Sequence, residues 1–366
     1  MADLISSLSD DIICYILYFL PSQQVVATSV LSKRWNLLWR SVFSLDFNAD
    51  NEDFWGLSYQ KTFITFYSSV CSFLVGRGDQ PFYRISLIGY SSIDGIIESI
   101  KTQIRTAVSG SDRVQILDMN CGYEIVIPSA VFSFKSLVTL KLKYITVEDI
   151  SLVDLPSLKI LHLKNIKVNL SQLLSGCPNL EDLKVKHLTC ETTGKFIGLP
   201  KLVRVRIDEL FLPLEIFKDV EVFKVDWIFQ PNNFDFQNLV QLKLIVGLDW
   251  LLLLEVLNHC PKLQSLVICI FKNDVRYFQT LNFPGYEEDV WPYPQTVPAC
   301  ISSHLKTIRL TRYSGSKDEF HFARYILENA KYLQTMEICF DDGYDLMETM
   351  ERELSSFRYL PRFVFI

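Results

Sequence analysis

Residues 137–142, LVTLKL, show the pattern that decides the fold of this chain, with apolar residues at the first, fourth and sixth positions. We call these three positions the anchors. The pattern starts at residues 114, 137, 158, 180, 202, 220, 239 and 263, as VQILDM, LVTLKL, LKILHL, LEDLKV, LVRVRI, VEVFKV, LVQLKL and LQSLVI. Successive starts are 23, 21, 22, 22, 18, 19 and 24 residues apart, so eight units of similar length follow one another.

Units of about 20–29 residues that contain L-x-x-L-x-L are typical of leucine-rich repeats, in which each unit adds one strand to a curved parallel sheet. The spacing therefore predicts an α/β solenoid over residues 111–290. Two units share their entry, LLSGCPNL at 173–180 and VLNHCPKL at 256–263, where we expect a short helix to end near the cysteine. The rhythm breaks over residues 271–300, which we interpret as an ordered insertion or a long loop, and resumes at LKTIRL (305) and LQTMEI (333).

The segment before the repeats has helical rather than strand periodicity. Apolar residues recur at helical spacing from Leu8 to Leu20, and Pro21 ends that pattern. Ser22 and Ser32 are expected to cap a second and a third helix. Three helices in about thirty residues form too small a core to stand alone, so we expect part of this apolar surface to cover a neighbour.

Residues 1–47 resemble an F-box. The residues that carry the resemblance are Leu8, Asp10, Ile12, Ile13, Ile16, Leu17, Phe19, Leu20, Pro21, the run from Ser29 to Trp35, Leu38 and Trp39. Two features depart from the family pattern, because Ser9 stands where a proline is usual and residues 3–6 lack the common basic residue. Ser9 can still cap the helix, with Asp10 and Asp11 near the positive end of the helix dipole. We expect the serine at position 9 to affect how tightly this segment binds an adaptor.

The resemblance implies that this segment binds a Skp-type adaptor and, through it, a cullin. The residues that we expect to bind the adaptor are Leu8, Ile12, Ile13, Ile16, Leu17, Leu20, Pro21, Val25, Val30, Leu31, Lys33, Arg34 and Trp35.

Residues 48–110 are expected to link the F-box to the repeats and to cap the solenoid. They contain a helix over 60–75 that ends at Gly76, a strand over 83–88 and a second helix over 96–108; a strand over 42–47 precedes them.

Residues 291–338 resemble the FBD module of plant F-box proteins. The matching residues are Trp291, Val297, Pro298, Cys300, Ser302 to Lys306, Gly315, Tyr325 to Ala330 and Leu333 to Met336. The chain as a whole resembles a plant F-box/LRR/FBD protein, in which a module over 291–366 caps the solenoid.

Charge on the predicted strands follows a pattern of its own. The third, fifth and seventh positions of each unit face away from the anchors, by the two-residue period of a strand. Across the seven units from 137 to 263 these 21 positions hold nine Lys or Arg and three Asp, a net charge of +6 in a chain of net charge -6. Our candidate target-binding residues are Lys141, His162, Lys184, Lys186, Arg204, Arg206, Lys224 and Lys243.

Two interpretations of this basic face stay open. Lysine can simply solubilise an exposed sheet, since stacked charges ~4.8 Å apart in water repel by only ~0.9 kcal/mol before screening. Alternatively, the face binds an acidic or phosphorylated partner.

Composition excludes several function classes. A net charge of -6 and a pI near 5.5 argue against a nucleic-acid-coating protein. The N-terminus has no secretory signal, and no apolar run reaches the ~20 residues that span a bilayer, so we expect a soluble cytoplasmic or nuclear protein that binds neither membrane nor nucleic acid. The nine cysteines and five histidines lack zinc-ligand spacing, and we expect no metal and no cofactor.

Catalytic motifs are not found in the sequence, so we expect a protein that is not an enzyme. Gly76-Arg77-Gly78 superficially resembles a phosphate loop, but a helix C-cap and turn explains it better. Cys177 and Cys260 fit buried packing better than nucleophilic catalysis.

These observations predict the substrate-recognition subunit of a Skp-cullin-F-box ubiquitin ligase, in which the repeats and the FBD module hold a target for degradation. Two alternatives remain: a leucine-rich-repeat receptor for a small anion or hormone, and a scaffold that binds the adaptor without degrading anything. The sequence does not name the target.

Overall fold

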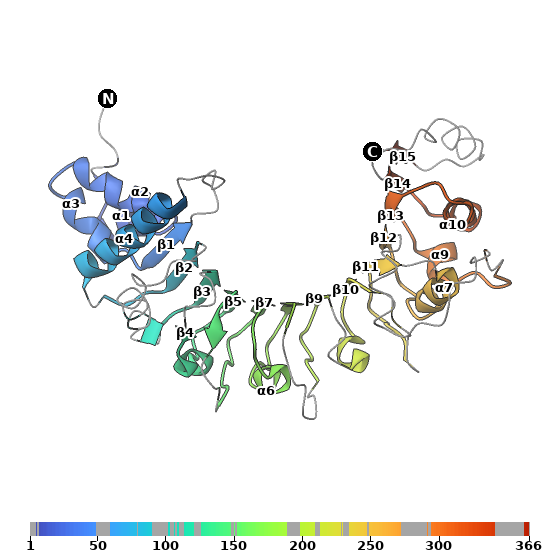
Figure 1. Cartoon of the computed structure of the whole chain (residues 1–366), viewed down its shortest axis with the longest axis horizontal. Helices are drawn as coiled ribbons and strands as arrows, with labels where there is room; N and C mark the ends of the chain where they lie inside the picture. Colours follow the sequence, from blue (N-terminus) through green and yellow to red (C-terminus); the bar gives the residue numbers. More distant parts are fainter. Residues whose placement is uncertain are drawn as a thin grey trace. The chain divides into compact units, whose positions relative to one another are not determined.

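The computed structural model describes the chain in segments (Figure 1). These are residues 5, 7–48, 59–78, 80–89, 102, 106, 108–109, 113–120, 126–147, 150, 152–188, 198–208, 213–227, 229, 234–246, 249–271, 291, 294–340 and 362–365. The chain forms two compact units, Met1–Lys201 (unit 1) and Leu202–Ile366 (unit 2). The predicted insertion over 271–300 and the predicted helix over 96–108 lie mostly outside the described residues.

Unit 1 begins with a small helical module. Its helices are α1 (Asp10–Leu17), α2 (Ser22–Ala27), η1 (Thr28–Val30), α3 (Trp35–Leu38) and η2 (Trp39–Ser41). Ser9 caps α1, because its side chain accepts a hydrogen bond from the Ile12 amide, and Asp10 and Asp11 lie in the first turn. The predicted cap is confirmed.

The predicted role of Ser22 is wrong. The chain enters α2 through Pro21, without a side-chain cap. Ser22 is instead the first residue of the helix, and its buried hydroxyl accepts a 2.8 Å hydrogen bond from the amide of Asp46 in β1 (Ser44–Asn48). The serine therefore joins the helical module to the sheet. Ser32 accepts a hydrogen bond from the Trp35 amide, but the residue directly before α3 is Arg34, which makes no side-chain cap.

Helix α4 (Tyr59–Arg77) follows β1 and packs against η2. The rings of Trp39 and Phe73 lie 5.5 Å apart. Gly76 is inside the helix rather than at its end, and a Cβ atom there would lie 2.6 Å from the Trp39 ring. The helix ends before Gly78, whose positive φ of 69° suits a C-terminal glycine. The helix-end interpretation of Gly76-Arg77-Gly78 is confirmed, with Gly78 as the turn residue.

The sheet of unit 1 is parallel. Its strands run in the order β1, β2 (Arg84–Ile88), β3 (Ile116–Asn120), β5 (Thr139–Lys143), β7 (Ile160–Lys164) and β8 (Asp182–Lys186). A second, two-stranded sheet joins β4 (Val126–Ile127) to β6 (Thr146–Val147). The short helices η3 (Ser129–Ser133) and α6 (Leu170–Ser175) lie between strands in the sequence.

The sheet of unit 2 is parallel as well. It runs through β9 (Arg204–Ile207), β10 (Val222–Val225), β11 (Gln241–Val246), β12 (Ser265–Ile270), β13 (Thr307–Tyr313), β14 (Thr335–Phe340) and β15 (Arg362–Phe365). Its helices among the described residues are η4 (Leu214–Phe217), α7 (Trp250–Asn258), α9 (Ala299–Ser303) and α10 (Lys317–Asn329). The FBD-like residues thus add strands to the sheet that the repeats begin.

The anchors form the core of both sheets. Of the three anchors in each of the ten predicted repeats, only Leu333 is partly exposed, and every other anchor is at most 4% exposed. The repeat pattern and the parallel strands that it predicts are therefore confirmed. The three buried cysteines of the described chain, Cys177, Cys260 and Cys300, pack as free thiols among these apolar side chains.

Candidate functional site

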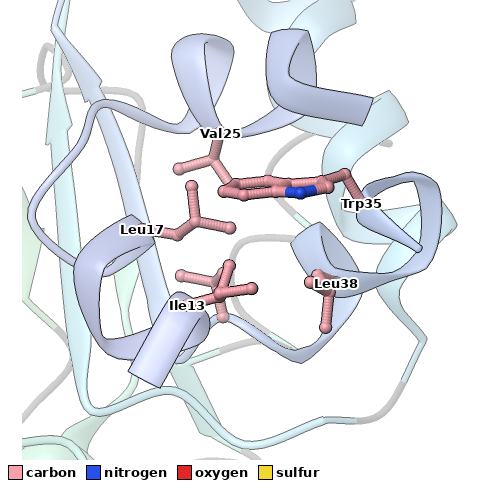
Figure 2. Packing of buried hydrophobic residues seen from close by; sticks show 6 residues of the cluster. Ile13, Leu17, Val25, Trp35 and Leu38 are labelled. Carbon is pink, nitrogen blue, oxygen red and sulfur yellow. The ribbon is translucent and has the colours of Figure 1, made fainter. Parts of the chain in front are cut away.

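The helical module has an apolar core of six residues. Figure 2 shows Ile13 and Leu17 of α1 pointing toward Val25, Trp35 and Leu38 from the following helices, and Val42 completes the cluster. All six are at most 8% exposed. Four of the residues that we expected to bind an adaptor, Ile13, Leu17, Val25 and Trp35, thus build the module's interior.

A second apolar face of α1 points to solvent. Ile12, Tyr15, Ile16 and Phe19 are between 46% and 66% exposed. Their spacing of three and four residues places them on one side of the helix and the turn after it. The rings of Tyr15 and Phe19 pack edge to face with centroids 5.1 Å apart. We call these four residues the exposed α1 face.

Further apolar residues of the module are exposed beyond α1. Val30 at the end of η1 is 84% exposed, and Leu31 and Leu37 are also exposed. Large exposed apolar patches are uncommon on a monomer and often mark binding sites, so these residues are candidates for contact with a partner. Tyr15, Phe19 and Leu37 were absent from our predicted set, although the i, i+3, i+4, i+7 spacing of residues 12, 15, 16 and 19 was a readable signal.

The other predicted adaptor-binding residues divide between surface and interior. Pro21, Lys33 and Arg34 are exposed, whereas Leu8 and Leu20 pack partly buried against the core. Arg34 has a structural role, because its Nε donates a 2.7 Å hydrogen bond to Asp10 Oδ1 and its Nη2 donates to the carbonyl of Leu8. It ties the segment before α3 to the start of α1.

Arg77 shows why the glycine-flanked arginine is not a phosphate site. Its guanidinium is buried and donates to the carbonyls of Arg40 and Pro81 at 3.2 and 2.8 Å. It also lies 3.9 Å from the centroid of the Phe82 ring. Burial lowers the pKa of Arg77 to about 10. The side chain therefore anchors the helix end to the start of β2.

On the sheet of unit 1, the fifth positions form a column of one acidic and three basic residues. Asp118, Lys141, His162 and Lys184 stand in register on adjacent strands. Lys141 Nζ lies 3.5 Å from Asp118, and His162 Nε2 lies 3.2 Å from Asp182. Asp118 was outside our candidate set, although it occupies the fifth position of VQILDM. The sheet itself thus offsets part of the predicted basic column.

The seventh positions of unit 1 hold a lysine on each of three adjacent strands. Lys143, Lys164 and Lys186 stand in register at the ends of β5, β7 and β8. Of these three, our candidate set contained only Lys186. We call the three residues the lysine ladder.

In unit 2 the fifth positions bring three predicted cations together. Arg206, Lys224 and Lys243 pair in register on β9, β10 and β11. Arg204 lies on β9 two residues before Arg206, on the same face. The Nε of Arg206 is buried without a hydrogen-bond partner among the described residues. Farther along this column, Arg309 of β13 pairs with Glu337 of β14.

Elsewhere in the described chain the structure offers little for catalysis. No cluster of three or more His, Cys, Asp or Glu side chains that could hold a metal occurs among the described residues. Burial raises the pKa of the Cys177 and Cys300 thiols to about 12, and that of Cys260 is raised further. Such thiols stay protonated at neutral pH and are poor nucleophiles.

None of the described helices is both long enough and apolar enough to span a membrane.

Comparisons with known proteins agree with this architecture. A family model of the F-box domain matches residues 5–46, and one of the FBD matches residues 293–338. An F-box/FBD/LRR-repeat protein of Arabidopsis thaliana is 30% identical to this chain, over 90% of the chain and 85% of the relative.

Two other proteins of Arabidopsis thaliana are similar over most of their length. An FBD-associated F-box protein is 29% identical over 93% of this chain and 94% of the relative. F-box/LRR-repeat protein 13 is 27% identical over 93% and 90%. Since a relative of that name is 30% identical over most of both chains, and both family models match, the chain belongs to the F-box/FBD/LRR-repeat proteins.

Proposed function

We propose that this chain is the substrate-recognition subunit of a Skp-cullin-F-box ubiquitin ligase. Its F-box would bind a Skp-type adaptor, and its repeats and FBD would bind a target protein. The F-box implies the adaptor, and proteins of this family are generally non-catalytic adaptors. The chain would act by proximity, because holding a target near a charged conjugating enzyme raises their effective concentration.

The exposed α1 face is the observation that carries the proposal. The module buries one apolar side of α1 in its own core and leaves Ile12, Tyr15, Ile16 and Phe19 exposed. These four side chains lie outside the core of the module, so they do not stabilise the isolated fold by being buried. Burying them against a partner would stabilise a complex by about 25 cal/mol for each Å² removed from water. We therefore expect this face, with Val30 and Leu31, to meet the adaptor.

Proximity labelling in the native cell tests both halves of the proposal. The full chain is expected to label a Skp-type adaptor and, when the proteasome is inhibited, an increased amount of at least one further protein. The matched variant is Ile16→Asp with Phe19→Asp, which places charges on the exposed α1 face without touching the core. It should lose the adaptor and keep the target, whose level should no longer respond to the proteasome inhibitor. Adaptor labelling that persists in the variant would exclude this face as the adaptor-binding surface.

A further inference from the structure

The face opposite the anchors changes in composition within unit 2. In the repeats that form β9 and β10, five of the six residues at the third, fifth and seventh positions are charged. In the repeats that form β11, β12, β13 and β14, only three of the twelve are charged, namely Lys243, Arg309 and Glu337. None of the twelve is buried. Solvent therefore reaches a part of the sheet that carries little charge.

The seventh positions form an uncharged row across these four strands. Ile245, Cys269, Thr311 and Cys339 are direct partners in register. Val267 adjoins the row, because it lies two residues before Cys269 on the same face of β12. All five residues are partly exposed. We call these five residues the uncharged patch.

The hydroxyl groups in and beside the patch form hydrogen bonds within the sheet. The hydroxyl of Thr311 donates to the carbonyl of Ile268 at 3.3 Å. In the third-position row, the hydroxyl of Thr307 donates to that of Ser265 at 2.9 Å. A cysteine side chain packs as a small apolar group. The patch therefore offers a partner mainly apolar contact.

Charged residues border the patch on the same face. Arg309 and Glu337 form an ion pair in the fifth-position row. Lys243 is exposed and stands in register with Lys224 of β10, and Asp226 follows two residues later on the same face. Over the six repeats from β9 to β14, the third, fifth and seventh positions hold five Lys or Arg and three Asp or Glu, a net charge of +2. The surroundings of the patch are thus weakly basic.

This distribution of charge is that of a protein interface. The centre of an interface is depleted in charged residues, whereas its rim is polar and accessible to solvent. Adjacent strands lie ~4.8 Å apart, so the seventh-position row spans ~14 Å. An extended segment presents side chains on one side every ~6.7 Å. Two side chains that are two residues apart in such a segment therefore both reach the row.

We propose that the uncharged patch binds an extended segment of the target protein, with apolar side chains at positions i and i+2 and acidic residues on both flanks. This inference rests on the proposed function, since it names the chemistry of the target. The two apolar side chains cover the seventh-position row and are removed from water there. The acidic flanks complement the net positive charge of the bordering positions.

The test uses the full chain bound to its adaptor and three pools of fluorescent peptides. The first pool has leucine, isoleucine, valine or phenylalanine at i and i+2 between acidic flanks. The second pool has serine at both positions, and the third keeps the apolar residues between basic flanks. Fluorescence anisotropy is expected to show the first pool binding at least about tenfold tighter than either other pool. Equal binding of the first pool and either other pool would overturn the proposal.

Added salt separates the two contributions. At ~1 M salt the Debye length falls to ~3 Å, so the preference for acidic over basic flanks should largely disappear. The preference for apolar residues over serine should persist, because burial of apolar surface does not depend on charge. Loss of both preferences at high salt would contradict an apolar site.

Two variants without a change of charge locate the site. Ile245→Asn with Val267→Asn removes apolar groups from the patch and should weaken binding of the first pool at least about tenfold. Ile160→Asn with Val222→Asn makes the same two changes at partly exposed third positions of β7 and β10. This control should change binding less than about twofold. Equal losses in the two variants would contradict the patch.

A milder pair, Ile245→Thr with Val267→Thr, keeps the β-branched shape and is used if the asparagine pair does not fold. It should weaken binding of the first pool at least about threefold. Melting curves show which variants are folded. Unchanged binding by a folded variant of either pair would overturn the proposal.

Two further measurements distinguish this inference from other outcomes. Sedimentation of the full chain should give the same mass for the wild type and the patch variant. Self-association that the variant abolishes would make the patch an interface between copies of this chain and overturn the proposal. Adaptor binding is measured on the same samples. A chain that binds the adaptor but none of the pools overturns this inference alone, whereas failure to bind the adaptor contradicts the proposed function.

Discussion

The F-box module and the repeat strands both place apolar residues at regular spacing, yet they use that spacing differently. In the strands of units 1 and 2, alternate residues point to opposite faces, and the anchors are buried almost without exception. In α1, two apolar faces lie side by side, and only Ile13 and Leu17 are buried while Ile12 and Ile16 are exposed. Position within a repeat therefore predicts burial, whereas position within a doubly apolar helix does not.

The largest expected difference in stability is between alanine substitutions at two neighbouring residues of one strand. Leu142 is fully buried at an anchor and Lys143 follows it on the opposite face. Leu142→Ala should lower the free energy of unfolding by about 2–5 kcal/mol, because it leaves a cavity. Lys143→Ala should change it by less than about 0.5 kcal/mol. Urea unfolding of the two variants measures the difference, and similar losses would show that the strand does not have one buried face.

Within α1, alanine substitutions at a buried and at an exposed isoleucine should give a smaller difference in stability. Ile13 is fully buried and Ile12 is 48% exposed. Ile13→Ala is expected to cost about 2–4 kcal/mol of stability, and Ile12→Ala less than about 1 kcal/mol. Thermal unfolding checks both values. If Ile12→Ala proved the more damaging change, the division of α1 into a core face and an exposed face would be wrong.

Sequence patterns predicted the features that depend on local periodicity. The repeat anchors, the helical module and the Ser9 cap all follow from residues near one another in the chain. The hydrogen bond from Asp46 to Ser22 and the contact between Gly76 and Trp39 join residues more than twenty positions apart. Nothing in the local pattern marks such contacts.

The candidate sites were predicted less completely, for a related reason. The cations of the sheet could be assigned to a face, but their pairing depends on strand register. Register places Asp118 beside Lys141 and aligns the lysine ladder. The adaptor-binding set mixed interior with surface because α1 is apolar on both sides. The predicted domain limits at 47, 110 and 290 stay predictions. The boundary between the two compact units falls at residue 201 and does not test them.

The buried thiols should make the protein less stable at alkaline pH, by about 1 kcal/mol each. Burial raises the pKa of Cys177 and Cys300 to about 12. The folded state then holds thiol protons that the unfolded state releases above its pKa near 9, so stability is retained below pH ~9 and lost as pH rises. Between pH 8 and pH 10 we expect a loss of roughly 1 kcal/mol per thiol, which Cys177→Ser and Cys300→Ser should reduce.

Urea unfolding at the two pH values measures this loss, with Cys339→Ser as a control at a partly exposed strand position. Equal pH dependence in all of these variants would mean that other groups cause the alkaline loss.

The smallest expected effect is at Ser9. Its φ of -67° already suits proline, and its capping hydrogen bond to Ile12 is long, at 3.5 Å. Ser9→Pro should therefore be neutral or stabilise the chain by about 0.4–1 kcal/mol, through the entropy of the unfolded state. The melting temperature and the adaptor affinity are measured together. A lower melting temperature with weaker binding would identify Ser9 as an indispensable cap.

The most direct test of the account is the dissociation constant between a Skp-type adaptor and this chain. Three proteins are compared by calorimetric titration: the wild type, Ile16→Asp with Phe19→Asp, and the control Val75→Asp, which places a charge on an exposed residue of α4 in the same unit. Burial of an unpaired charge costs several kcal/mol, so the double variant should bind at least about 100-fold more weakly while the control binds like the wild type. Unchanged affinity in a folded double variant would contradict the claim that the exposed α1 face is the adaptor-binding surface.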